Sequence, residues 1–138
     1  MPQSTTRARA TGFPGYSETL PRRPESAAVA RRLVRAALAV WALDELADNG
    51  ALLVSELVSN AVRHARRASV RVIVERTAQW TVRIAVADLS RIRPVLSLPE
   101  LSEEEGRGLL LVTALATRWG CDERGWGKIV WAELEARR

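Results

Sequence analysis

Glu56 and Asn60 are the residues whose types and spacing point most directly to chemistry. They are four positions apart, so on a helix both side chains project from the same side. At about 100° per residue, they lie at the edge of an apolar arc and away from Ser55 and Ser59. Asparagine is unfavourable inside a helix and a half-buried glutamate is costly, so the pair suggests orienting a hydroxyl or holding a hard cation through oxygen. The alternative is a polar stripe on a packed helix.

Two helices must position this pair. Apolar residues recur at helical spacing from residue 25 to about residue 43, which predicts the first helix. The same periodicity predicts a second helix from about residue 51 to residue 66. Between them, Asn49-Gly50 in the segment 44–50 indicates a turn or a helix cap. The polar pair therefore lies on the second helix.

Alternation of apolar and other residues replaces the helical period in the second half of the chain. Residues 70–75 and 82–87 alternate in this way, which predicts two adjacent strands in an antiparallel hairpin. The second strand runs into Asp88, where a carboxylate could face a cleft or simply start a turn. Two more strands are predicted at 119–123 and 128–135. Helices early and strands late predict an α+β fold, a two-layer sandwich whose mixed, mainly antiparallel sheet is covered on one face by helices.

A short glycine motif precedes a third predicted helix at about 108–117. Gly106-Arg107-Gly108-Leu109 would expose backbone N–H groups at the helix start, which suits an anion. The alternatives are that the glycines are ordinary caps and that Arg107 is a solvated arginine. Lys128, the chain's single lysine, follows Gly127 at a strand start. Its charge suits a phosphate or a partner protein, and equally an edge strand protected from aggregation.

Composition narrows the classes of protein. The 138 residues fit one folded domain, preceded by a flexible arm over residues 1–24. The N-terminus lacks the apolar stretch of a signal peptide and no run approaches the roughly 18 apolar residues of a membrane span, so we expect a cytoplasmic protein. The single cysteine excludes an internal disulfide. The net charge of +5 is spread over the whole chain, so direct nucleic-acid binding is a less favoured alternative.

Four segments in this order resemble one family. They are the Glu-Leu-Val-x-Asn box ending at Asn60, the strand-end Asp88, the box Gly106-Arg-Gly-Leu109 and the closing segment Gly127–Glu133. Together they resemble the GHKL superfamily of ATP-binding domains, and within it the bacterial anti-sigma-factor serine/threonine kinases. The resemblance covers about residues 25–135. It implies a histidine-kinase-like ATP-binding domain over residues 25–138 with the Bergerat-type fold.

The resemblance also implies roles for individual residues. ATP and Mg²⁺ would be the cofactors, with Asn60 as the metal ligand and Glu56 as the general base of a serine/threonine kinase. Asp88 would accept the exocyclic amine of adenine. The remaining nucleotide contacts would come from the glycine box: Gly106, Arg107, Gly108 and Leu109. We further expect Leu89–Glu105, which is long and contains two prolines, to form a lid over this site.

The expected partner is a sigma factor or an anti-sigma antagonist, with a role in transcription regulation, and homodimers are common among the resembling kinases. One departure from the family motif motivates an alternative function. Kinases of this group usually carry Asp-x-Gly-x-Gly, whereas this chain reads Asp88-Leu-Ser-Arg-Ile-Arg-Pro94. The alternative is therefore a catalytically inactive partner-switching adaptor with the same fold.

Overall fold

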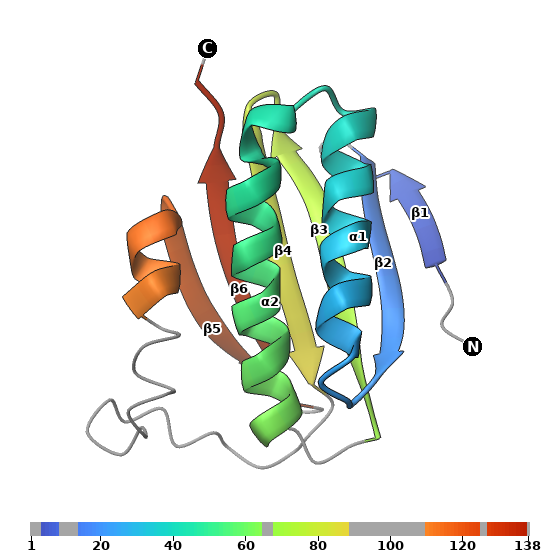
Figure 1. Cartoon of the computed structure of the whole chain (residues 1–138). Coiled ribbons are helices and arrows are strands. Elements are labelled where there is room, and N and C mark those ends of the chain that lie inside the picture. The colour runs from blue at the N-terminus through green and yellow to red at the C-terminus, as the bar shows by residue number, and fades with distance from the viewer. Residues whose placement is uncertain (1–3, 9–13, 65–67, 89–109, 125–126, 138) are drawn as a thin grey trace.

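The protein is a two-layer sandwich of helices on one sheet (Figure 1). The computed structural model describes residues 4–8, 14–64, 68–88, 110–124 and 127–137. The strands are β1 (Ser4–Ala8), β2 (Pro14–Pro21), β3 (Ser69–Ala78), β4 (Thr81–Asp88), β5 (Arg118–Arg124) and β6 (Gly127–Glu135). The helices are α1 (Ser26–Val40), the short 3₁₀ helix η1 (Asp44–Leu46) and α2 (Ala47–His64). The predicted α+β fold is confirmed.

The sheet has the order β1-β2-β3-β4-β6-β5, and each described pair of neighbouring strands is antiparallel. The expected mixed sheet is thus antiparallel throughout its described part. β3 and β4 form the predicted hairpin, in which Val72 lies opposite Val86 and Val74 opposite Ile84. All four of these side chains are buried. Since alternate residues of a strand point to opposite faces, one face of the sheet is apolar and the helices cover it.

The two long helices bury matching apolar faces. Val34 and Leu38 of α1 and Leu53 and Val58 of α2 are fully buried. Val40, which belongs to the apolar repeat predicted for the first helix, is 69% exposed instead. α1 packs on β2 and β3, α2 packs on β3, β4 and β6, and both helices belong to the same core as the strand valines. At about 25 cal/mol per Å² of buried apolar surface, this layer is the main source of the fold's stability.

Two strands lie within the segment that the sequence predicted to be a flexible arm. β2 pairs along its length with β3, and β1 pairs with β2. Leu20 of β2 is 1% exposed and belongs to the core, and Tyr16 packs on Trp41 with ring centroids 5.6 Å apart. These strands correct the arm prediction. Their short sequence has little alternation of its own, and they are ordered by pairing, β2 with β3 and β1 with β2.

The connection between the helices also differs from its prediction. Residues 44–50 were expected to form a linker with a turn or cap at Asn49-Gly50, but α2 already begins at Ala47. Gly50 therefore lies inside the helix. A Cβ atom there would come within 3.0 Å of Val34 and 3.2 Å of Leu38, so this glycine allows α1 and α2 to approach closely.

A further helical stretch covers the β5 side of the same face. Residues 110–115 are helical, in agreement with the predicted third helix, and Val112 belongs to the core. Thr113 Oγ1 accepts a hydrogen bond of 3.0 Å from Trp119 Nε1 of β5. Among the helices of the described ranges, none has both the length and the apolar character needed to cross a membrane.

Candidate functional site

Glu56 and Asn60 lie on the flank of α2 that is turned away from α1. Ser55 marks the opposite flank, because its hydroxyl accepts a hydrogen bond of 2.8 Å from Arg31 of α1. Around the helix axis, Glu56 and Asn60 are about 100° and 140° from Ser55. Both side chains are half-buried. Leu57, which lies between them in the sequence, points into the core and so sets which way this side of the helix faces. The predicted placement of the polar pair, at the edge of the apolar face, is confirmed.

Asp88 is the last residue of β4 and is 2% exposed. It shares the helix-covered face of the sheet with Val86 and Ile84, because alternate residues of a strand face the same side. α2 and β4 run toward the same end of the molecule, as Figure 1 shows. Asn60 is one turn before the end of α2 at His64, so the carboxamide and the buried carboxylate lie toward the same end of the domain.

The sequence allows two interpretations of Lys128: a charge that faces a phosphate or a partner protein, or a charge that protects an edge strand. β6 lies between β4 and β5, so the prediction of an edge-strand charge is wrong. Lys128 is 4% exposed, lies directly opposite Asp88 in the β4–β6 register, and its Nζ is 3.8 Å from Asp88 Oδ2. In the sequence, Asp88 ends one predicted strand and Lys128 begins another. The missing signal was that these strands, separated by about 40 residues of chain, are neighbours in the sheet.

The side-chain oxygens at this end suit a hard cation. Glu56 and Asn60 offer a carboxylate and an amide oxygen, and Mg²⁺ typically takes one or two protein oxygens together with phosphate oxygens and water. In the described ranges, no group of three or more metal-binding side chains forms a complete metal site. The predicted glycine box Gly106, Arg107, Gly108 and Leu109 and the expected lid Leu89–Glu105 lie outside the described residues.

Cys121 of β5 lies on the same, helix-covered face of the sheet. It lies opposite Val130 in the β5–β6 register and is partly buried against the core. Burial raises the pKa of the Cys121 thiol, and the positive charge of Lys128 opposes that rise. The thiol is therefore less reactive than an exposed cysteine at neutral pH.

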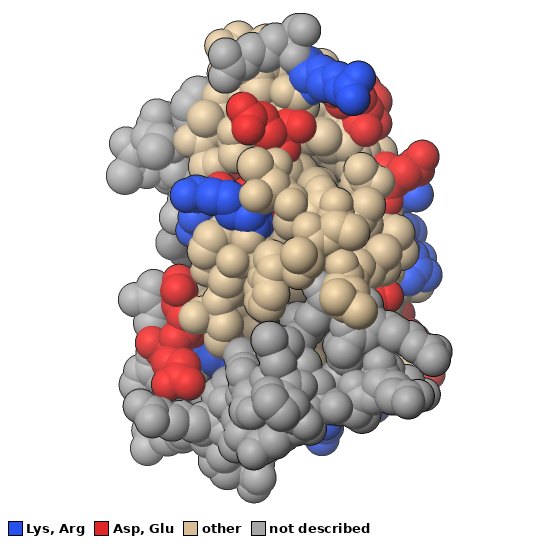
Figure 2. Space-filling view, turned by 90° about the vertical axis from the view of Figure 1, so that its left-hand side faces the viewer, with Lys and Arg blue, Asp and Glu red and all other residues tan. Residues whose placement is uncertain are grey.

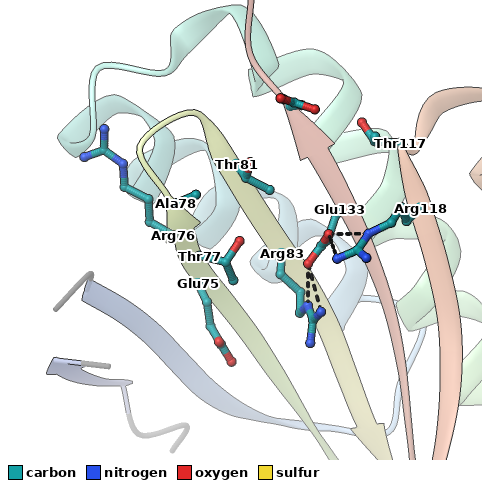
Figure 3. Close-up of a pocket in the computed structure, with 10 residues that line it drawn as sticks. Glu75, Arg76, Thr77, Ala78, Thr81, Arg83, Thr117, Arg118 and Glu133 are labelled. Atoms are coloured by element: carbon teal, nitrogen blue, oxygen red, sulfur yellow. Dashed lines mark hydrogen bonds and ion pairs between the residues drawn. The ribbon is translucent and has the colours of Figure 1, made fainter. Parts of the chain in front are cut away.

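The opposite, open face of the sheet carries a separate hollow of about 610 Å³ (Figure 3). Its centre is Glu133 of β6, a carboxylate with only 6% exposure of its side chain. Arg83 of β4 donates to Glu133 Oε2 at 2.9 Å, and Arg118 of β5 donates to Oε1 at 2.9 Å. The guanidinium of Arg83 also lies 4.3 Å from the centre of the Trp131 ring. These contacts link β4, β5 and β6, and both carboxylate oxygens of Glu133 accept hydrogen bonds in them.

On the side of the molecule that carries β5, the charges of the described residues do not single out a nucleic-acid interface. On the side that carries β5, acidic and basic side chains of the described residues are interspersed with uncharged surface (Figure 2). Several arginines are engaged in local contacts, such as Arg35 with Asp48 at 3.1 Å and Arg71 with Ser17 at 2.7 Å. A concentrated basic patch is what phosphate-backbone binding requires.

Comparison with known proteins agrees with the fold described above. The family model of the histidine kinase-like ATPase domain matches residues 20–134. Among solved structures, the chain is similar to the histidine kinase domain of the blue-light activated histidine kinase from Erythrobacter litoralis EL346, with a TM-score of 0.52 and 21% identity. That match covers 96% of this chain and 65% of the other, so the chain spans just under two thirds of that domain's length. No curated protein sequence matches significantly. The chain belongs to the family of histidine kinase-like ATPase domains.

Proposed function

We propose that this protein is a cytoplasmic ATP-Mg-binding regulator that acts as a serine/threonine kinase on a partner protein in transcriptional control. Membership of the ATPase-domain family supports the coarser statement, an ATP-binding regulatory function. The observation that carries the proposal is that three oxygen-bearing side chains belong to two elements that pack together and run toward the same end of the molecule. They are Glu56 in the middle of α2, Asn60 one turn before its end, and the buried Asp88 at the end of β4.

Each residue has a role that its chemistry permits. The Asp88 carboxylate accepts a hydrogen bond from the amine of adenine, and its burial excludes competing water. The Asn60 amide oxygen holds Mg²⁺, which, when bound, neutralises charge on the phosphate oxygens. Glu56, one turn away on the same flank, takes the proton of the attacking hydroxyl. We place the phosphate contacts in Gly106, Arg107, Gly108 and Leu109, as the family resemblance implies.

The partner is a sigma factor or an anti-sigma antagonist, whose serine or threonine receives the phosphoryl group or which is held in an inactive complex. We place the docking surface on the exposed side of α1. Arg32 and Arg35 are exposed there, and Arg31 is partly buried through its bond to Ser55. A basic helix surface favours an acidic partner. This surface leaves the sheet edges available for a homodimer.

A second candidate function is the partner-switching adaptor without phosphotransfer. Two observations favour it. The segment directly after Asp88, residues 89–94, contains no glycine that would let the backbone approach a nucleotide closely. In addition, Asp88 already lies 3.8 Å from the buried Lys128, so adenine would have to share the carboxylate with this lysine.

Nucleotide binding is the first test. Isothermal titration of Mg-ATP into the whole protein should give saturable binding, and Asn60→Ala should abolish the Mg²⁺-dependent part. Asn49→Ala is the matched control, since Asn49 is exposed in the first turn of the same helix. Absence of saturable binding at millimolar Mg-ATP would overturn the nucleotide-binding proposal. Equal losses in both variants would remove Asn60 from the site.

Phosphotransfer separates the kinase from the adaptor. A partner is captured from the native cell, identified by mass spectrometry and incubated with the protein and radiolabelled ATP. Label on a serine or threonine of the partner that is lost in Glu56→Gln and kept in Glu45→Gln supports the kinase. Glu45 is a suitable control because it is exposed and precedes α2 at its other end. Nucleotide binding without any transfer would establish the adaptor.

A further inference from the structure

Lys128 brings a cation to the position where the proposed site would read a base. It is the second residue of β6 and lies opposite Asp88 in register, so both side chains point to the helix-covered face. The side chain of Lys128 is 6% exposed and that of Asp88 is 2% exposed. A lysine is almost never buried to this degree without a partner. In the described part of the chain, its ion-pair partner is Asp88.

The geometry of the pair leaves the ammonium group with hydrogen-bonding capacity. Its Nζ is 3.8 Å from Asp88 Oδ2, beyond the roughly 2.7 to 3.2 Å of an N–H···O hydrogen bond. The carboxylate therefore balances the charge of Lys128 without accepting a hydrogen bond from its ammonium group. An ammonium has three donors, and a carboxylate accepts up to about four hydrogen bonds, so both groups can contact one ligand together.

We propose that Lys128 is a base-reading residue and that, with Asp88, it admits 6-oxopurine nucleotides such as GTP and ITP in addition to ATP. This inference rests on the proposed function, which places a purine against Asp88. It concerns base selection only.

The edges of the two kinds of purine explain the inference. Adenine carries a donor amine at position 6 and an acceptor at N1, whereas guanine and hypoxanthine carry an acceptor oxygen at position 6 and a donor at N1. A lone carboxylate at position 6 accepts from the adenine amine and repels the oxygen. A neighbouring ammonium donates to that oxygen, and the carboxylate then accepts from N1–H. Asp88 and Lys128 together therefore satisfy both edges.

The competing interpretation is that Lys128 binds phosphate, as a point charge often does. The two interpretations differ in one measurable respect. A phosphate ligand lowers the affinity for every triphosphate equally when it is removed, whereas a base-reading lysine affects only the nucleotides that carry an oxygen at position 6.

Competition binding of ATP, GTP, ITP and inorganic tripolyphosphate to the whole protein tests the inference. In the wild type, GTP and ITP should bind within about tenfold of ATP. Lys128→Met should weaken GTP and ITP by about 10- to 100-fold, the range for a hydrogen bond to a charged group, and ATP by less than about threefold. Arg83→Met is the matched control. It removes a cation that faces a buried carboxylate on the opposite face, so it should leave all four affinities unchanged.

A second measurement needs no substitution. Because Lys128 is the only lysine in the sequence, isotope-labelled lysine gives one NMR signal for each type of side-chain nucleus, without overlap from other lysines. GTP and ITP should shift the Cε and Nζ resonances more than ATP does, and tripolyphosphate should leave them in place. This readout stands even if Lys128→Met does not fold.

Two results would overturn the inference while the proposed function stands. One is wild-type protein that binds ATP but binds GTP and ITP more than about 100-fold more weakly. The other is a tripolyphosphate shift as large as that of GTP, with equal loss of all ligands in Lys128→Met, which would place Lys128 on the phosphates. Absence of any nucleotide binding would overturn the proposed function and this inference with it.

Discussion

The two faces of the sheet each bury a carboxylate beside a cation, but in different ways. On the open face, Glu133 is bonded by Arg83 and Arg118 at hydrogen-bond distance, which links β4, β5 and β6. On the covered face, Lys128 approaches Asp88 only to 3.8 Å, although both side chains are more deeply buried than the two arginines. Burial of a charge alone therefore does not identify a functional site. What distinguishes the covered face is an ion pair longer than hydrogen-bond distance, on two strands that pack against α2.

The largest expected difference between the faces is in stability. Ile84→Ala, at a fully buried position under the helices, should lower the free energy of unfolding by about 3 to 4 kcal/mol. Ile73→Ala is the matched change on the open face of the neighbouring strand, where the side chain is half-buried, and should cost about 1 kcal/mol. Urea unfolding followed by circular dichroism measures both. Equal losses would mean that the open face is as tightly packed as the core.

Neutralising the two carboxylates should give crossed effects. Asp88→Asn removes the charged acceptor and should weaken Mg-ATP by at least about tenfold, since hydrogen bonds to charged groups exceed about 1.5 kcal/mol. Glu133→Gln should leave nucleotide affinity unchanged and lower the free energy of unfolding by about 1 to 2 kcal/mol, a modest figure because the Arg118 side chain is 64% exposed. Titration calorimetry and urea unfolding on both variants are the measurements. A loss of Mg-ATP affinity in Glu133→Gln would break the distinction between the faces.

A smaller effect is expected at Gly120, where β5 passes under the Trp131 ring of the open face. A Cβ there would lie 2.8 Å from the ring, so Gly120→Ala must displace it and should cost about 1 to 2 kcal/mol. The control is Gly120→Ala in a Trp131→Leu background, where the penalty should shrink. A full penalty in that background would show that the glycine is needed for its backbone alone.

The smallest effect is in the chemistry of Cys121. Because burial raises the pKa of this thiol above its ordinary value of 9.0, alkylation by iodoacetamide should be slow near neutral pH and should accelerate only above about pH 9. The raised pKa also means that its contribution to stability is present below pH 9 and is lost as pH rises through the folded-state value. Lys128→Met should slow the alkylation further, because the lysine charge lowers the pKa. Faster labelling in that variant would contradict the placement of Lys128 beside β5.

Elements with a strong local pattern were predictable from the sequence. The hairpin of β3 and β4 was predicted because apolar residues alternate through both strands, and α1 because apolar residues recur along it at helical spacing. β1 and β2 were not predicted. Their order depends on the pairing of β2 with β3 and of β1 with β2, which a local pattern does not contain. The start of α2 was placed too late because Asn49-Gly50 is typical of a turn, whereas Gly50 packs against α1.

The candidate site shows the same division. The spacing of Glu56 and Asn60 predicted a shared flank, and the strand ending at Asp88 predicted a terminal carboxylate. The pairing of Asp88 with Lys128 was not predictable, because it depends on β6 lying beside β4 rather than at an edge. Strand order is set by the packing of the whole sheet.

We propose that nucleotide binds on the covered face, toward the end shared by α2 and β4. An NMR titration with Mg-ATP that follows backbone amides tests this placement. We predict shifts concentrated at Asn60, Asp88 and Lys128, with Arg83, Arg118 and Glu133 unchanged. Shifts concentrated at those last three residues, around the hollow of the open face, would contradict the claim.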